Sequence, residues 1–156
     1  MKIFVASDHA GFHLRQKVLM HLRSKASVEI VDLGPPTFDR SDYPDYAAPV
    51  GRAVRDNPGT LGVLACGSGI GMAIAANKVH GVRAADAFSI EAARLSRSHN
   101  DANVLCLGER LLAPDTALAA LDVFLETPFQ GGRHQDRVAK ITALEQAEAA
   151  GKASEP

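Results

Sequence analysis

Residues 61–78 read LGVLACGSGIGMAIAANK, and this stretch decides how the rest of the chain folds. Its first six residues are an apolar run that indicates a buried β-strand, and its alanine-rich second half predicts a helix. Three alternating glycines lie between them, from Gly67 to Gly71. A glycine-rich turn at a helix start exposes main-chain N–H groups beside the positive helix end, so it favours an anion. Cys66 ends the strand, where a helix N-terminus favours its thiolate. The stretch therefore predicts an anion-binding loop that carries a reactive thiol.

Three known phosphate loops do not fit this stretch. A Walker loop needs Lys and Ser or Thr after its last glycine, but Met72 and Ala73 follow Gly71. A dinucleotide fingerprint needs Gly-x-Gly-x-x-Gly, and the spacing here is one residue too short. A Cys-x5-Arg phosphatase loop would need arginine where Met72 stands. The remaining alternative is a small-residue turn that packs a helix on a sheet, with Cys66 as an inert core thiol.

Length and composition exclude several classes of protein. The 156 residues are enough for one domain, expected over residues 1–148 with a frayed tail over 149–156. A net charge of −1 and the absence of Trp argue against nucleic acid and anionic membranes as partners. No apolar run is long enough to span a membrane. Cys66 and Cys106 lie in apolar runs of a chain without an export signal, so we expect reduced thiols and a cytoplasmic location.

The rest of the chain alternates between apolar runs and helical patterns. We expect strands at 2–7, 28–33, 61–66, 82–87 and 103–108, and helices at 12–25, 46–55, after the glycine loop, at 89–98, from 114, and up to about 148. Pro49 is expected in the first turn of its helix, and Ser89 as an N-cap. This alternation predicts an α/β fold, a three-layer αβα sandwich around a five-stranded, mostly parallel, Rossmann-like sheet with a C-terminal helix. The order of the fourth and fifth strands and the role of the polar loop at 37–45 stay open.

Two polar clusters should meet at one edge of this sheet. Asp8-His9-Ala10-Gly11 follows the first strand, and Cys66-Gly67 follows the third. In a strand order that begins 2-1-3, ligands bind beyond the carboxyl ends of strands 1 and 3. The topology therefore predicts that Asp8, His9 and Cys66 share a crevice.

Other charged residues fit either a site or a solvated surface. Arg133 and Arg137 are four residues apart at a helix start, a spacing that suits a phosphate clamp or an exposed helix face. His9, His99 and His134 each follow a predicted break in secondary structure. A zinc site is a rival interpretation, but no His or Cys pair has short ligand spacing. We therefore expect no metal and no cofactor.

Five motifs in order resemble the type B ribose-5-phosphate isomerases, which share a family with the galactose-6-phosphate isomerase subunits. The resemblance covers residues 2 to about 146, and the motifs are DHAG at 8–11, DYP at 42–44, CGSGIG at 66–71 with AANK at 75–78, HND at 99–101 and GGRHQxR at 131–137. Each motif alone is weak, but five in the right order are specific.

The resemblance implies a metal-free aldose–ketose isomerase of the pentose phosphate pathway, which interconverts ribose 5-phosphate and ribulose 5-phosphate through an enediolate. It implies that Cys66 is the base, with Ser68 beside it in the place of a Thr or Ser, and that His99 opens the furanose ring. By the same resemblance, the backbone of Gly67, Ser68, Gly69, Ile70 and Gly71 would stabilise the enediolate, Asp8 would bind sugar hydroxyls, and His9, Arg110, Arg133 and Arg137 would hold the phosphate with Asn100 nearby. Members that use a glutamate base carry it where this chain has Met72.

The isomerisation reaction itself requires the same kinds of functional group. Isomerisation needs a base poised near neutral pH, donors aimed at an oxyanion, and an anchor for the phosphate. Two alternatives remain, isomerisation of another sugar phosphate such as allose, galactose or tetrose phosphate, and a non-catalytic sugar-phosphate-binding protein.

The position of His99 predicts the quaternary structure. His99 precedes the fifth strand, so it lies at the amino edge of the sheet, whereas Cys66 lies at the carboxyl edge. We expect a homodimer, pairing further into a tetramer if the surface allows, in which each site combines Cys66 of one chain with His99 of the other.

Overall fold

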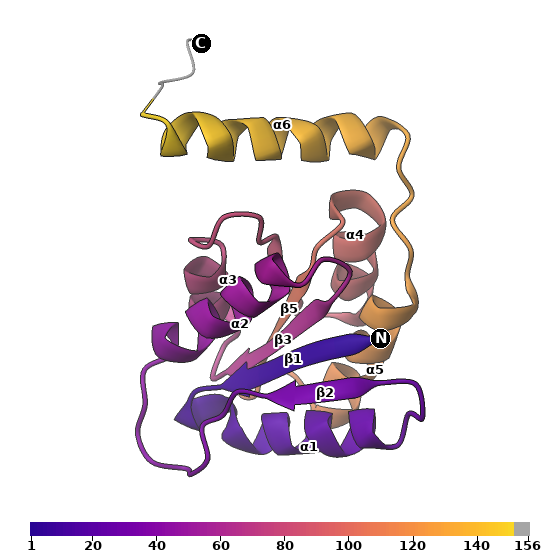
Figure 1. Ribbon diagram of the computed structural model, residues 1–156. Helices are drawn as coiled ribbons and strands as arrows, with labels where there is room; N and C mark the ends of the chain where they lie inside the picture. The colour runs from indigo at the N-terminus through magenta and orange to yellow at the C-terminus, as the bar shows by residue number, and fades with distance from the viewer. Residues whose placement is uncertain (152–156) are drawn as a thin grey trace.

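The computed structural model describes residues 1–151 and has a five-stranded parallel sheet at its centre (Figure 1). The strands are β1 (Lys2–Ser7), β2 (Glu29–Asp32), β3 (Leu61–Cys66), β4 (Ala84–Asp86) and β5 (Val104–Gly108), in the order β2-β1-β3-β5-β4. The helices are η1 (His9–Gly11), α1 (Phe12–Arg23), α2 (Pro44–Asp56), α3 (Ile70–Ala76), α4 (Ile90–Asn100), α5 (Pro114–Glu126) and α6 (Arg133–Ala149). The predicted fold class and the order beginning 2-1-3 are confirmed, and β4 occupies the edge.

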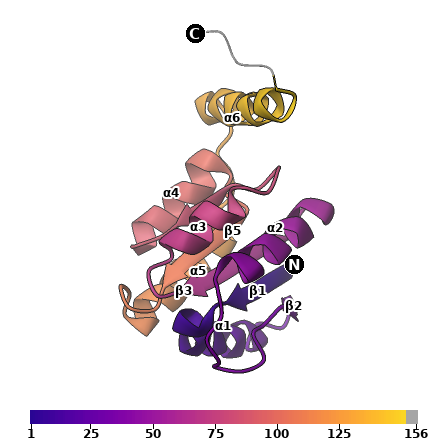
Figure 2. The same cartoon turned by 90° about the vertical axis from the view of Figure 1, so that its left-hand side faces the viewer.

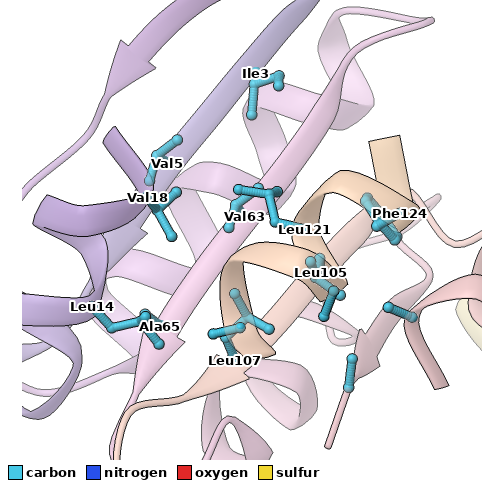
Figure 3. Close-up of a cluster of buried hydrophobic side chains, with 14 of the residues drawn as sticks. Ile3, Val5, Leu14, Val18, Val63, Ala65, Leu105, Leu107, Leu121 and Phe124 are labelled. Carbon is cyan, nitrogen blue, oxygen red and sulfur yellow. The ribbon is translucent and has the colours of Figure 1, made fainter. Parts of the chain in front are cut away.

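Side chains alternate across the sheet and build two cores. Ile3, Val63 and Leu105 face α1, α4 and α5, and Figure 3 shows this cluster between the sheet and the helices. Their chain neighbours face α2 and α3, so Leu64 and both cysteines belong to the second core. The helices therefore cover both faces of the sheet, as a parallel sheet requires.

The second helix differs from the prediction at its start. It begins at Pro44, which takes the first-turn position that proline suits, rather than near residue 46. Pro49 therefore lies inside the helix and not in its first turn. It has no N–H to donate to the carbonyl of Asp45, so the helix lacks one backbone hydrogen bond there. The polar loop is correspondingly shorter and ends at Tyr43.

The segment around His99 is also different from the prediction. His99 and Asn100 lie in the last turn of α4 rather than in a break, because the helix continues until Asp101 adopts the left-handed conformation. Ser89 is the N-cap of this helix, as predicted, and its hydroxyl accepts the N–H of Ala92 at 3.1 Å.

Helix α6 stands apart from the sheet and lies beside α4 (Figures 1 and 2). It lines a hollow together with Ala84 and Ala85 of β4. The Gly81 N–H donates to the Glu145 carboxylate at 2.9 Å, and the Gln130 N–H donates to the Ser98 carbonyl at 3.0 Å. Ile141 and Leu144 remain about half exposed, at 47% and 52%. Helix α6 extends to Ala149, the first residue of the expected frayed tail, and residues 152–156 of that tail lie outside the described part of the chain.

Candidate active site

A cavity of about 370 Å³ opens at the carboxyl ends of β1, β3 and β5. It is lined by Asp8, His9, Ala10, Tyr43, Cys66, Gly67, Ser68, Gly71, Arg110 and Leu111. Seven of the predicted site residues therefore meet here, and Gly69 and Ile70 continue the same loop. Larger hollows lie elsewhere, among them one at the amino edge of the sheet and one beneath α6. The cavity at the carboxyl edge is the candidate active site because, unlike those two, it contains a thiol, a carboxylate and an imidazole together.

Cys66 sits at the base of this cavity with 4% of its surface exposed. The Gly69 N–H donates to its sulfur at 3.1 Å, so the glycine loop turns back over the thiol. A main-chain donor aimed at sulfur stabilises negative charge there, which suits a thiol that acts as a base.

Cys106 lies in the same core but in a different environment. It is fully buried on β5, and burial, with the charges of Asp86 and Cys66, raises the pKa of its thiol well above the ordinary value. Cys106 is therefore a neutral core thiol, and it does not line the cavity.

Asp8 connects the end of β1 to the start of the cavity. One oxygen of its carboxylate accepts the Gly11 N–H at 3.0 Å and caps η1. The other oxygen has no hydrogen-bond partner within residues 1–151, although only 6% of the residue is exposed. An oxygen in this position can accept hydrogen bonds from hydroxyl groups of a ligand.

His9 is held by the polar loop whose role the sequence left open. Its Nδ1 lies 2.9 Å from the Ser41 carbonyl and 3.3 Å from the Ser41 nitrogen, and its main-chain N–H donates to the Ser41 hydroxyl at 3.1 Å. Nδ1 therefore faces both an acceptor, the Ser41 carbonyl, and a donor, the Ser41 N–H, and the tautomer decides which of the two it bonds. The other ring nitrogen, Nε2, is then the one free to interact with a ligand.

Tyr43 is a cavity residue to which the sequence assigned no role. A Cβ built on Gly71 would lie 2.9 Å from its Cζ, so the phenol end of the ring rests on the glycine loop. The Tyr43 position was visible in the DYP motif, but nothing in the sequence placed the loop over the third strand.

Arg110 lies flat against the residue that follows Cys66. A Cβ built on Gly67 would come 3.3 Å from the guanidinium carbon, and the Arg110 N–H donates to the Gly67 carbonyl at 3.0 Å. Glu109, which the sequence reading missed, accepts the Leu14 N–H at 2.8 Å. This contact fixes the start of α1 to the end of β5, and so fixes the Asp8 side of the cavity relative to Arg110.

Two glycines let neighbouring elements approach the Cys66 loop from both sides. A Cβ on Gly11 would lie 2.3 Å from the Ala65 carbonyl carbon, and a Cβ on Gly108 would lie 2.6 Å from that of Ser68. Only a residue without a side chain fits such distances to backbone atoms, so η1 and β5 hold the loop between them.

Asp86, at the end of β4, is a second residue that the sequence reading missed. Its carboxylate lies beside Gly69, because a Cβ there would be 2.1 Å from Oδ1, and burial raises the pKa of this carboxyl. No sequence signal identified it, because its place depends on β4 pairing with β5.

Four predicted site residues lie away from this cavity and its glycine loop. His99 and Asn100 end α4, and Arg133 and Arg137 are exposed at the start of α6. The His99 ring stacks on His134, with centroids 4.1 Å apart and planes 8° from parallel. Burial, with the charges of His99, Arg133 and Arg137, lowers the pKa of His134. These four residues form a second cluster beside the α4–α6 contact.

Metal-binding clusters and membrane-spanning helices are both absent from residues 1–151. No three His, Cys, Asp or Glu side chains come together as a group that could hold a metal ion. None of the helices there is both long and apolar enough to cross a membrane.

Comparison with known proteins identifies relatives over almost the whole chain. Residues 3–141 match the family model described as Ribose/Galactose Isomerase. The probable ribose-5-phosphate isomerase B of Mycoplasma pneumoniae is 44% identical over 144 residues, which are 92% of this chain and 94% of the relative. Ribose-5-phosphate isomerase B of Escherichia coli is 43% identical and covers 93% and 97% of the two chains.

Solved structures agree with this similarity. Ribose-5-phosphate isomerase B of Clostridium thermocellum superposes with a TM-score of 0.92 at 43% identity, covering 95% of this chain and 99% of the other. The enzyme of Mycoplasma genitalium, solved with bound ribulose 5-phosphate, gives 0.90 at 46% identity, with 93% and 96% covered. The chain therefore belongs to the ribose/galactose isomerase family.

Proposed function

We propose that this chain interconverts ribose 5-phosphate and ribulose 5-phosphate through an enediolate, with Cys66 as the base. The observation that carries the proposal is a thiol at the base of a polar cavity, covered by a glycine loop that donates an N–H to its sulfur. Family membership supports the coarser statement, that the chain is a sugar-phosphate isomerase, and the names of its relatives support ribose 5-phosphate as the substrate.

The proposed chemistry moves one proton between two carbons. The Cys66 thiolate takes the proton from C2 of the open-chain aldose, the electron pair forms the C1–C2 double bond, and the carbonyl oxygen becomes negative. N–H groups of residues 67–71 stabilise this oxyanion. The enediolate then receives the proton at C1, a proton passes between the two oxygens, and the thiolate is regenerated. Asp8 binds sugar hydroxyls, Ser68 lies beside the reacting carbons, and His9 and Arg110 bind the phosphate.

The remaining residues require a second subunit. β3 has six residues, about 20 Å at 3.3 Å each, and α4 leads into β5 at the opposite edge from Cys66. We therefore propose a homodimer in which the partner supplies His99 to open the furanose ring, with Asn100, Arg133 and Arg137 beside the phosphate. A tetramer built from two such dimers would contain the same shared sites.

A turnover assay with two matched variants tests the proposed activity. Purified protein is assayed with ribose 5-phosphate, allose 6-phosphate, galactose 6-phosphate and erythrose 4-phosphate. Cys66→Ala should lower kcat by roughly 10²-fold to 10⁴-fold, the range that one general base supplies, while still binding the sugar phosphate. Cys106→Ala, which removes the other thiol of the same core, should keep its kcat.

The outcomes separate the alternatives. Binding without turnover in the native protein would indicate a sugar-phosphate sensor, and preference for a six-carbon or four-carbon substrate would move the assignment to that sugar. A Cys66→Ala variant that turns over normally would remove Cys66 from the mechanism.

A mixing experiment tests the shared site. Cys66→Ala and His99→Asn chains are unfolded and refolded together, so that half the dimers contain both variants. Each mixed dimer has one site with both groups intact, and activity should return to about a quarter of wild type. Should mixed dimers form and remain as inactive as the parents, His99 would have to serve its own chain.

A further inference from the structure

Asp101 follows His99 and Asn100 and has an unusual backbone conformation. Among residues 1–151 it is the one non-glycine residue with a positive φ, at 46° with ψ at 44°. Its N–H donates to the Arg97 carbonyl at 3.1 Å and ends helix α4. Glycine adopts this conformation most readily, and asparagine and aspartate follow because their short polar side chains can hydrogen-bond locally.

The Asp101 carboxylate bridges two arginines. Arg83 Nη2 lies 2.9 Å from Oδ2, and Arg97 Nη1 lies 2.8 Å from Oδ1. The side chains of these arginines are only 23% and 16% exposed, so water screens the ion pairs less than pairs on the open surface. Each carboxylate oxygen therefore holds a different element of the fold, since Arg83 precedes β4 and Arg97 belongs to α4.

The two arginines also hold the main chain of this turn. Arg83 Nε donates to the carbonyls of Asn100 at 3.1 Å and Asp101 at 2.9 Å. Arg97 Nη1 donates to the Ala102 carbonyl at 2.6 Å, and its guanidinium lies 5.6 Å from the centre of the Phe124 ring. The backbone from Asn100 to Ala102 is thus fixed to β4 and to the core.

None of these groups lines the cavity that contains Cys66, so the Asp101 network has no direct contact with that site. It lies directly behind the turn that presents His99 and Asn100. We propose that Asp101 is a positioning residue. Its bridge to Arg83 and Arg97 sets the direction in which the side chains of His99 and Asn100 extend toward the partner's cavity. The inference rests on the shared site proposed above, which it deepens.

Asp101→Asn tests the bridge with little change in shape. Asparagine accepts the left-handed conformation but cannot pair with two guanidinium groups. We expect kcat/KM for ribose 5-phosphate to fall about 10-fold to 100-fold, because a displaced catalytic group costs about that much. The rate at which iodoacetamide labels Cys66 should not change, because the cavity on the same chain is intact.

Asp56→Asn is the matched control. Asp56 is also a carboxylate in an ion pair, with Arg55 Nε at 2.7 Å, but its side chain is 58% exposed and the pair lies on α2. This variant should keep the wild-type kcat/KM. An Asp101→Asn enzyme as active as the Asp56→Asn enzyme would overturn the proposal.

Mixed refolding then shows which half of the site has failed. Asp101→Asn chains refolded with Cys66→Ala chains should recover about a quarter of wild-type activity, because the first chain supplies Cys66 and the second supplies a correctly placed His99. Asp101→Asn refolded with His99→Asn should recover nothing beyond its own residual activity. If the mixture of Asp101→Asn with Cys66→Ala does not recover although the shared site itself is intact, Asp101 acts on folding in general, which also overturns the proposal.

The shared site itself has a separate control. The mixture of Cys66→Ala with His99→Asn reports on the shared site without involving Asp101. Loss of recovery there would refute the proposed dimer site. Recovery there, combined with no recovery in the mixture of Asp101→Asn with Cys66→Ala, would refute only the role of Asp101.

Discussion

Cys66 and Cys106 are two thiols of one core on neighbouring strands, and their surroundings separate their chemistry. Cys66 lines the cavity and accepts an N–H from the glycine loop, whereas Cys106 is fully enclosed and its pKa is raised by burial. A thiol reacts as its thiolate, so access and charge stabilisation both favour Cys66.

Alkylation measures this difference directly. Iodoacetamide should label Cys66 much faster than Cys106, turnover should be lost in step with that labelling, and ribose 5-phosphate should slow it. Mass spectrometry of the peptides that contain each cysteine follows both reactions in one sample. Equal labelling of the two thiols with activity retained would contradict the assignment of Cys66 as the base.

The α4–α6 contact is an element whose stability should depend on pH. His99 and His134 stack there, and burial, with the cations nearby, lowers the pKa of His134 below the ordinary value of about 6.5. A lowered folded-state pKa means that the unfolded chain binds this proton more readily. The contribution of His134 to stability is therefore present above pH 6.5 and is lost as the pH falls below it.

Thermal unfolding at pH 7.5 and pH 5.5 tests this linkage. The wild-type Tm should fall on acidification by more than that of His134→Gln, which has no imidazole to protonate. His13→Gln, which removes an exposed histidine of α1, should retain the wild-type response. If the Tm of wild type and of His134→Gln falls by the same amount, the stack with His99 does not hinder protonation of His134.

At the level of the elements, local patterns predicted the strands well and the helix ends less well. The bounds of β1 and β3 are as predicted, because each is a short apolar run between polar or glycine residues. Helix ends are set by single residues in special conformations, such as Asp101, and by which of two prolines takes the first turn in α2. Polarity alone does not reveal these choices.

For the molecule as a whole, strand topology carried most of the site prediction. The rule that ligands bind beyond the carboxyl ends of strands 1 and 3 is enough to predict that Asp8, His9 and Cys66 lie together. The place of Tyr43 depends on the path of an aperiodic loop, and the place of Asp86 depends on the order of two strands. Neither feature can be predicted from sequence periodicity. The cluster that contains His99 lies away from Cys66, which agrees with the predicted topology. That a second subunit brings the two together stays a proposal.

The close approach of Gly11 and Gly108 to the Cys66 loop also limits how this gene can vary. Every other amino acid carries a Cβ, so any missense change in either codon pushes a backbone segment away from the loop. Apart from synonymous changes, no nucleotide substitution in either codon is therefore expected to be neutral. Ser68 differs from these two glycines because its side chain lines the cavity, so a substitution there changes the cavity and does not press on a backbone segment.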